Sequence, residues 1–313
     1  MAHASAVVFA YSNVGARCLR VLRAHGIDVT LVVTHADNPN EALWFERVAD
    51  VAASLDLPVV MPADPNTPDF VARIAALAPD FIFSFYYRQM LSAALLAVAP
   101  RGAFNMHGSL LPQFRGRAPV NWAVLHGERA TGATLHAMTV KPDAGDIIAQ
   151  TAVPILPDDT AQQVFDKVTV AAEITLDSAL PALLDGNAPR RAQDPELASY
   201  FGGRRPEDGT IDWSAHAATV HNLVRAVAPP YPGAFTHVAG VPARVLRTRV
   251  LDAHMASAVA PALETSAGAL TAHCGGGGCL RILALEVEGT ATSAAGLAAR
   301  FGPAPLPLGA ARA

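Results

Sequence analysis

AVVFAYSNVGARCLRVLRAHGIDVTLVV, residues 6–33, is the stretch that decides the fold class of this chain. The apolar runs at 6–10 and 28–33 are nearly continuous, which is typical of parallel strands covered on both faces. Between them, residues 14–26 carry apolar side chains at helical spacing. Strand, helix and strand in this order predict one β-α-β unit of a parallel sheet.

The same alternation continues through the first 190 residues. Further strands are expected at the apolar runs that begin at Pro58, Phe81, Ala103, Ala133 and Asp146, and further helices at 41–55, 68–77 and 160–184. We therefore expect an α/β fold with a Rossmann-like parallel sheet over residues 1–190. The first strand is followed by one glycine instead of GxGxxG, so the dinucleotide-binding class of this fold loses its main support.

A stretch rich in Pro, Gly and charge begins at Asp185. Such a composition favours an interdomain linker, which we place at 191–210. Beyond it, a helix at 216–227 precedes short strands that are separated by glycines without long helices between them. This pattern predicts a small, OB-like β-barrel domain over residues 211–313, with a frayed end rich in Pro and Ala.

Composition excludes several classes of protein. The 313 residues are 51% hydrophobic and 16% charged, with a net charge of −4. This is too apolar for a disordered chain, and no run reaches the ~18 consecutive apolar residues that a membrane helix needs. There is no global basic field to drive binding to nucleic acid, although a local patch stays open. We expect neither membrane insertion nor a nucleic acid partner.

Cys18, Cys274 and Cys279 are the three cysteines of the chain. An odd number, with no basic and apolar leader segment, favours the reducing cytoplasm. Cys274 and Cys279 flank four glycines beside His273, but no second ligand pair follows at the spacing of a zinc site. We interpret this segment as a glycine turn between two strands and expect no metal.

Asn105 and His107 are candidate catalytic residues. They lie two residues apart on an expected strand, so their side chains project to the same side. An amide that donates to an oxyanion and an imidazole that moves a proton together suit acyl transfer. Asp143 follows another strand-like run, and a carboxylate beside His107 would orient its ring and raise its pKa. The alternative is structural: a histidine satisfied in the core and an asparagine that caps a turn.

No covalent nucleophile accompanies these residues. GxSxG does not occur in the sequence, and Ser109 lies in a turn that no strand of the nucleophile-elbow kind precedes. Direct attack of an amine on a bound acyl donor is therefore the expected reaction.

The segment NMHGSLLPQFRGRAP at 105–119, with KPDAGDI at 141–147, resembles the folate-dependent formyltransferases. In that family the donor is 10-formyltetrahydrofolate, and an asparagine, a histidine and an aspartate form the catalytic set. The resemblance implies these roles for Asn105, His107 and Asp143. On this hypothesis Asn105 and protonated His107 donate to the oxyanion, and Asp143 keeps the imidazole charged.

The resemblance covers nearly the whole chain and points to the sugar-nucleotide branch of the family. After SLLP, tRNA formyltransferases typically have RGAAPIQ, whereas this chain has RGRAPVNW at 115–122. The implied acceptor is UDP-4-amino-4-deoxy-L-arabinose of lipid A modification and polymyxin resistance. The implied pathway partner is a separate decarboxylase, and a homo-oligomer stays open.

The same resemblance assigns residues to the two substrates. The implied folate contacts are Gln89, Met90, Leu91, Arg117, Thr139, Val140, Lys141, Pro142 and Asp143, and the implied sugar-nucleotide contacts are Ser109, Asn121 and Arg204. Three alternatives stay open. The first is that Met90 and Leu91 are core residues at the start of a helix and do not contact folate. The second is that Arg117 binds the sugar nucleotide instead of folate, and the third is that Arg204 belongs to a solvated arginine pair.

The resemblance leaves open, as an alternative acceptor, another nucleotide-linked amino sugar. Two rival functions lie outside this branch of the family. A methionyl-tRNA formyltransferase also joins this kind of catalytic domain to a small barrel. Binding tRNA needs a basic face, however, and Arg244, Arg247 and Arg249 are a modest cluster in a chain of net charge −4. The other rival is a folate- or nucleotide-binding module without activity, which is disfavoured because all three catalytic positions hold competent residues.

Overall fold

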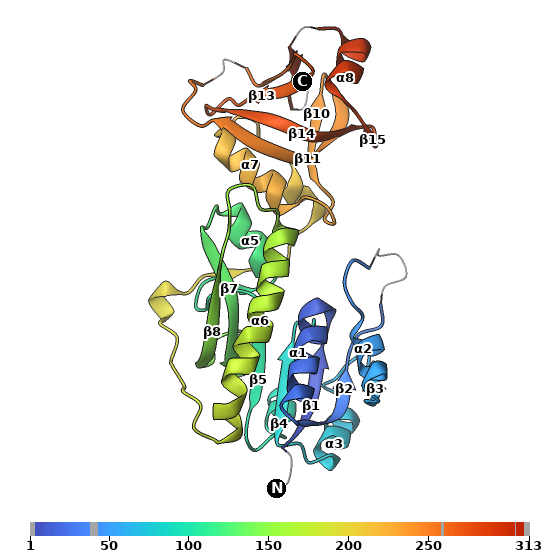
Figure 1. Cartoon of the computed structure of the whole chain (residues 1–313), viewed down its shortest axis with the longest axis vertical. Coiled ribbons are helices and arrows are strands. Elements are labelled where there is room, and N and C mark those ends of the chain that lie inside the picture. The colour runs from blue at the N-terminus through green and yellow to red at the C-terminus, as the bar shows by residue number, and fades with distance from the viewer. Residues whose placement is uncertain (1–3, 38–42, 258–259, 304, 310–313) are drawn as a thin grey trace. The chain divides into compact units, whose positions relative to one another are not determined.

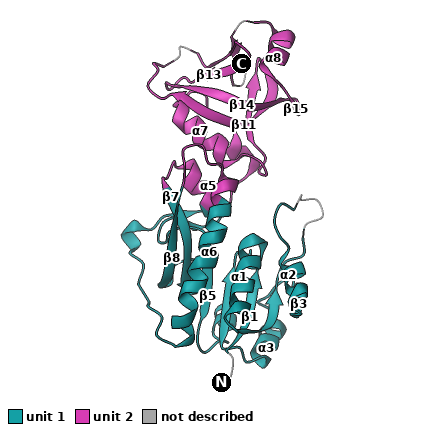
Figure 2. Cartoon of the chain, viewed as in Figure 1, with its two compact units in different colours: residues 1–119, 130–154, 165–202 teal, residues 120–129, 155–164, 203–313 magenta. Residues whose placement is uncertain are grey.

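The computed structural model describes residues 4–37, 43–257, 260–303 and 305–309. The chain divides into two compact units (Figure 2). Unit 1 comprises Met1–Pro119, Ala130–Pro154 and Phe165–Gly202, and unit 2 comprises Val120–Arg129, Ile155–Val164 and Gly203–Ala313. Each unit is thus assembled from segments that are distant in the sequence, whereas the sequence interpretation divides the chain into two continuous domains.

Unit 1 is built on a seven-stranded sheet in the order β3-β2-β1-β4-β5-β7-β8 (Figure 1). Its strands are β1 Ser5–Ala10, β2 Asp28–Val33, β3 Val59–Val60, β4 Phe81–Phe85, β5 Ala103–His107, β7 Ala130–Ala137 and β8 Ile147–Pro154. β1 to β5 are parallel, which confirms the predicted α/β class. β7 and β8 instead run antiparallel to their neighbours. A short loop joins β7 to β8, and a parallel pair would need a longer crossover.

Six helices belong wholly or partly to unit 1 or to its connections. They are α1 Ser12–Ala24, α2 Val48–Ser54, α3 Pro68–Ala76, α4 Ala93–Leu96, α5 Pro119–Leu125 and α6 Ala161–Leu184. In unit 1, α1 and α6 lie side by side on one face of the sheet (Figure 1), where His25, just after α1, contacts Asp177 of α6 at 2.8 Å. The long helix expected at 160–184 is confirmed.

The helix expected at 41–55 is shorter than predicted. α2 begins only at Val48, and residues 43–47 are not helical. The main-chain N–H of Glu46 donates to Oδ1 of Asn13 at 2.7 Å, so a side chain of α1 satisfies this group without a helical turn. Positions 41–42 lie outside the described residues.

The expected linker at 191–210 is corrected for its first half, which packs as part of unit 1. Arg191 forms an antiparallel bridge with Ile147, beside the start of β8. Further on, β9 (Tyr200–Phe201) pairs in parallel with β6 (Arg115–Gly116). Pairing of these main-chain groups outweighs the Pro, Gly and charged composition that favoured a linker.

Unit 2 contains the predicted barrel-like sheet. Its strand order is β10-β11-β14-β13-β12-β16, with β15 paired to β14. The strands are β10 Ala234–Val238, β11 Val241–Asp252, β12 Ala262–Ser266, β13 Ala269–His273, β14 Cys279–Val287, β15 Thr290–Ala291 and β16 Leu306–Pro307. A bridge between Val238 and Leu308 links the two ends of this order, so the antiparallel sheet is nearly closed.

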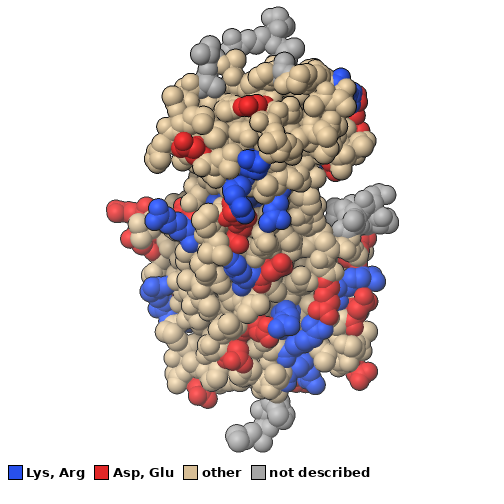
Figure 3. All heavy atoms as spheres, turned by 45° about the horizontal axis from the view of Figure 1, so that its top comes forward, with Lys and Arg blue, Asp and Glu red and all other residues tan. Residues whose placement is uncertain are grey.

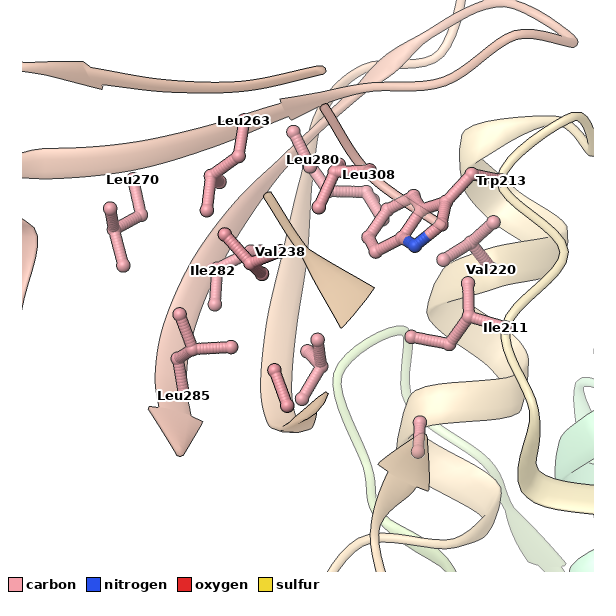
Figure 4. Packing of buried hydrophobic residues seen from close by; sticks show 14 of the residues in the cluster. Ile211, Trp213, Val220, Val238, Leu263, Leu270, Leu280, Ile282, Leu285 and Leu308 are labelled. Atoms are coloured by element: carbon pink, nitrogen blue, oxygen red, sulfur yellow. The ribbon is translucent and has the colours of Figure 1, made fainter. Parts of the chain in front are cut away.

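Trp213 is a buried member of the hydrophobic core of unit 2 and lies beside Ile211, Val220 and Leu308 (Figure 4). Its indole N–H donates to Oγ1 of Thr236 at 2.7 Å, so the one polar atom of a buried ring is satisfied. Leu280, Ile282 and other strand residues belong to the same cluster. The described part of this unit also contains the helices α7 Ala217–Ala226 and α8 Ala294–Phe301, together with most of α5.

The segment between Cys274 and Cys279 is a turn, as predicted. It joins β13 to β14, with His273 opposite Cys279 in the antiparallel pair. Gly277 and Gly278 have φ values of +99° and +82°, a region that favours glycine. Cys274 and Cys279 are buried free thiols.

Two further expectations concern the end of the chain and the membrane. The end is not frayed through Gly309, because Leu306 and Pro307 pair with β12; positions 304 and 310–313 lie outside the described residues. Within the described ranges, no helix is long and apolar enough to cross a membrane.

Candidate active site

Asn105 on β5 faces His136 on β7, since the two residues are partners in the antiparallel register. Nδ2 of Asn105 donates to Nε2 of His136 at 3.0 Å. Nδ1 of His136 in turn donates to the carbonyl of Ala137 at 2.9 Å, which leaves Nε2 as the acceptor. His136 therefore fixes the orientation of the Asn105 amide and leaves its second N–H for a ligand.

His107, the last residue of β5, is buried, with 7% of its surface exposed. Its Nε2 donates to the carbonyl of Phe114 at 2.8 Å. Its Nδ1 lies 3.5 Å from Oδ1 of Asp143. With the Nε2 proton held by a carbonyl, Nδ1 is the ring nitrogen whose lone pair is left to accept a proton.

Asp143 lies in the loop between β7 and β8, and its carboxylate is close to both His107 and His136. Its Oδ1 is also 3.5 Å from Nε2 of His136. Its Oδ2 accepts the main-chain N–H of Gly116 at 2.9 Å. The structure thus brings together Asn105, His107 and Asp143.

Gly116 is needed where it stands. Its φ is +97°, and a Cβ there would lie 2.1 Å from the carbonyl oxygen of Phe201. A larger residue would displace β6 from β9, and the N–H that binds Asp143 would move with it.

The electrostatics of the site differ from the prediction for His107. Burial lowers the pKa of His107, while Asp143 and the carbonyl of Phe114 act in the opposite direction and His136 and Arg115 add to the lowering. Asp143 acts on this pKa in the expected direction, but the net direction is downward, so the imidazole is not kept charged by the carboxylate. Desolvation of the charged form outweighs the attraction of the carboxylate.

Asp143 stays ionised. Burial raises the pKa of its carboxyl, but the neighbouring imidazoles of His107 and His136 and the hydrogen bond from the N–H of Gly116 together outweigh burial. The pKa therefore lies well below its ordinary value. The resting pair is an ionised carboxylate beside a neutral imidazole.

The sequence interpretation missed His136. Its residue type was visible in ATLHAMTV, but only the register of β7 on β5 places it opposite Asn105. The signal that would have found it is a histidine on the strand that follows the Asn-x-His strand.

The residues predicted to hold folate at 89–91 lie just after β4. Nε2 of Gln89 donates to the carbonyl of Ala63 at 2.9 Å. Met90 is exposed, and its carbonyl accepts from Asn66 at 2.9 Å. The side chain of Leu91 belongs to the hydrophobic core, so only its main chain is available to a ligand.

The other predicted folate residues form the loop before Asp143. Oγ1 of Thr139 donates to the carbonyl of Lys141 at 2.8 Å, and Val140 is exposed. Lys141 and Pro142 line a cavity of about 260 Å³ in unit 1. The other residues that line it are Arg115, Ala198, Ser199 and Tyr200. A pocket of this kind beside Asp143 is suited to a ring system.

The side chains of Arg117 and Ser109 differ in their exposure to a ligand. Arg117 is exposed, and its main-chain N–H donates to the carbonyl of Phe201 at 3.0 Å, which leaves the guanidinium outside this pairing. Ser109 has no exposed surface and donates to the carbonyl of Gln113 at 2.6 Å. The hydroxyl of Ser109 therefore stabilises the turn, which corrects its assignment as a substrate contact.

Asn121 and Arg204, predicted to bind the sugar nucleotide, belong to unit 2 and not to the unit of the catalytic residues. Nδ2 of buried Asn121 donates to the carbonyl of Ala226 at 2.9 Å. Arg204 donates to the carbonyl of Asp208 at 3.0 Å, and its guanidinium lies 4.9 Å from the centre of the Trp122 ring. Arg204 is thus held in place, unlike a freely solvated arginine.

Solved structures with the same fold include two enzymes. The N-formyltransferase from Helicobacter canadensis, solved with folinic acid and dTDP-3-aminofucose, is 16% identical with a TM-score of 0.70; the match covers 90% of this chain and 99% of that one. WlaRD, a sugar 3N-formyl transferase solved with dTDP and 5-N-formyl-THF, is 17% identical with a TM-score of 0.69, over 92% and 99% of the two chains.

HypX from Aquifex aeolicus, in a substituted variant, is also similar. It is 18% identical with a TM-score of 0.63, and the match covers 96% of this chain but 48% of HypX.

The family models match both parts of the sequence. Residues 5–180 match the model described as formyl transferase, and residues 204–300 match the formyl transferase C-terminal domain. The first match spans more than half of the chain and contains all three catalytic candidates. The chain belongs to the formyl transferase family.

Proposed function

We propose that the chain transfers the formyl group of 10-formyltetrahydrofolate to the amino group of a nucleotide-linked amino sugar. The observation that carries this proposal is the cluster of Asn105, neutral His107 and ionised Asp143. It provides an oxyanion donor, a proton acceptor and a carboxylate that stabilises the imidazolium. The H. canadensis enzyme and WlaRD, each solved with a formylated folate, support the choice of donor.

The reaction begins with the neutral amine. Its lone pair attacks the formyl carbon, the new C–N bond forms, and the carbonyl π electrons move to the oxygen. The second N–H of the Asn105 amide donates to this oxyanion, since the first is held by His136. Nδ1 of His107 accepts a proton from the attacking nitrogen.

The intermediate then collapses. The oxyanion re-forms the carbonyl, the bond between carbon and N10 of the folate breaks, and His107 gives its proton to N10. The products are the formamide and tetrahydrofolate. Asp143, 3.5 Å from Nδ1 of His107, stabilises the imidazolium between the two proton transfers. His107 acts first as a base, a role that the sequence left open and that its lowered pKa favours, and then as an acid.

Ligand contacts complete the proposal. We assign folate to the main chain of 89–91, to the loop at 139–143 and to the free guanidinium of Arg117. The cavity beside Lys141 and Pro142 supports a ring-binding role for this loop. We assign the sugar nucleotide to Asn121 and Arg204, of which Arg204 brings a positive charge suited to a diphosphate.

The acceptor we propose is UDP-4-amino-4-deoxy-L-arabinose, the lipid A precursor, in a pathway with a separate decarboxylase. RGRAPVNW at 115–122 supports it over tRNA. In unit 1 and unit 2 alike, the face drawn in Figure 3 has basic and acidic side chains interspersed. The net charge of −4 gives the chain no global basic field of the kind that favours binding to tRNA. Three buried free thiols accord with a cytoplasmic location.

One assay with four acceptors tests the proposal. The chain is mixed with 10-formyltetrahydrofolate and, in turn, UDP-4-amino-4-deoxy-L-arabinose, a dTDP-3-aminohexose, a dTDP-4-aminohexose and charged initiator tRNA. Tetrahydrofolate release is followed, with His107→Ala as the inactive control. Release with the UDP sugar is the expected result. Release with tRNA alone would overturn the choice of acceptor, and release with a dTDP sugar alone would correct the nucleotide.

A further inference from the structure

We propose that Gln193 is a positioning residue for the catalytic carboxylate, because its side-chain amide bridges the main-chain carbonyls of Asp143 and Gly145 to a buried arginine. The inference rests on the proposed function, in which Asp143 stabilises the imidazolium of His107. Gln193 lies in the segment that the sequence interpretation assigns to a linker.

The amide of Gln193 holds the turn that carries Asp143. Its Nε2 donates to the carbonyl of Asp143 at 2.9 Å and to the carbonyl of Gly145 at 2.7 Å. Both protons of the amide are therefore used on one turn of three residues. This fixes the main chain from which the carboxylate projects.

Arg115 fixes the amide in turn. Its Nε and Nη2 donate to Oε1 of Gln193 at 3.1 and 2.7 Å. Only 7% of the Arg115 surface is exposed. Because a guanidinium cannot accept a hydrogen bond, the amide of Gln193 cannot flip, and its N–H groups stay directed at the loop.

The same two-stranded sheet holds the carboxylate itself. Gly116, next to Arg115 on β6, donates its N–H to Oδ2 of Asp143 at 2.9 Å. β6 is paired to β9, and the N–H of Arg115 donates to the carbonyl of Ser199 at 2.9 Å. Main chain and carboxylate of Asp143 are thus anchored to one element.

Asp143 needs this support. Its φ is +52°, a left-handed conformation that a residue other than glycine keeps only where its surroundings hold it. Without the amide, the turn relaxes and the carboxylate leaves its place 3.5 Å from Nδ1 of His107. A displacement of about 1 Å at a reacting group costs up to about 10²-fold in rate.

Gln193→Met removes both donors and keeps the length of the side chain without adding a charge. We expect kcat to fall about 10–100-fold, with KM for both substrates within about threefold of wild type, an allowance for ordinary mutational scatter. Gln150→Met is the matched control. Gln150 also bridges an arginine, Arg191, to a main-chain carbonyl, that of Leu111, but does not touch the turn of Asp143.

A titration without substrate separates this inference from the proposed function. The pKa of His107 is measured by NMR in wild type and in both variants. The charged and titratable groups that face His107 are Asp143, His136 and Arg115. Loss of the carboxylate from its place lowers the pKa of His107, whereas a displaced Arg115 alone would raise it. A lower pKa in Gln193→Met and an unchanged one in Gln150→Met support the inference; no change or a rise overturns it.

A double variant gives the kinetic counterpart. If Gln193 acts through Asp143, Gln193→Met has no further effect on kcat in an Asp143→Asn background, while independent roles multiply the two losses. Gln193→Glu keeps a partner for Arg115 and serves where Gln193→Met fails to fold, with the same loss of kcat expected. If the wild type transfers no formyl group, the proposed function fails, and the titration still decides the role of Gln193.

Discussion

Asp143→Asn replaces a carboxylate by an amide of nearly the same shape beside His107. In the wild type, Oδ2 of Asp143 accepts from Gly116. We expect the oxygen of the introduced amide to accept this hydrogen bond. The NH₂ group then occupies the position of the wild-type Oδ1, which is 3.5 Å from Nδ1 of His107. The substitution therefore removes the charge that stabilises the imidazolium and directs a donor at the atom that must accept a proton.

The distance sets the magnitude. Two unit charges 3.5 Å apart attract by about 5 kcal/mol at an effective dielectric constant of ~20, and by about 1 kcal/mol in water. The site is buried but not sealed, so the loss lies between these values. Since about 1.4 kcal/mol corresponds to tenfold in rate, kcat falls by about 10- to 10³-fold.

Tetrahydrofolate release at saturating substrates is the assay. We expect lower kcat with KM changed by less than about threefold, because Asp143 acts on the intermediate more than on bound substrate. The acid limb of the pH–rate profile moves to lower pH, because the group that raises the pKa of His107 is gone. A folded variant with kcat within about threefold of wild type would refute this account of Asp143.

Four further predictions concern other residues of the chain. Asn105→Ala lowers kcat by about 10²–10³-fold through loss of an oxyanion donor. His136→Leu lowers kcat about tenfold because the Asn105 amide is no longer oriented. If either variant has the same kcat as the wild type, Asn105 is not the oxyanion donor that His136 orients. Trp213→Ala costs about 3–5 kcal/mol in urea unfolding, as a large core residue does, and a cost below about 1 kcal/mol would show that this core is not organised around the indole. Folded His107 has a lowered pKa, so the unfolded chain binds more protons below about pH 6.5. Stability is therefore lost as the pH falls, and the slope should be smaller in His107→Gln; an equal slope counts against a buried neutral imidazole.

The parts predicted well are those with a strong local pattern. The apolar runs at 6–10 and 81–85 are strands with nearly no exposed side chains, and short continuous apolar runs that alternate with helical segments were sufficient to find them. Asn105 and His107 were placed correctly on one strand, since alternation along a strand is a local property. The turn before Cys279 was also predicted correctly, because four consecutive glycines are a local signal for a turn.

The parts that were missed depend on partners far away in the sequence. β9 is two residues long and forms only because β6 offers it a main-chain partner some 85 positions earlier. His136 gains its role from the register of β7 on β5, and Gln193 from a turn 50 positions earlier. The protonation of His107 was predicted from one neighbour, whereas burial, which no local pattern states, decides its direction.

Formyl transfer to an amino sugar, measured with purified chain, tests the central claim most directly. The acceptor UDP-4-amino-4-deoxy-L-arabinose is incubated with 10-formyltetrahydrofolate, and the product is identified by the mass of one added formyl group. We predict a formamido sugar with one equivalent of tetrahydrofolate, and no product with His107→Ala. Wild-type protein that forms no formylated sugar from this acceptor or from the dTDP-linked amino sugars, or His107→Ala that turns over like the wild type, would contradict the account.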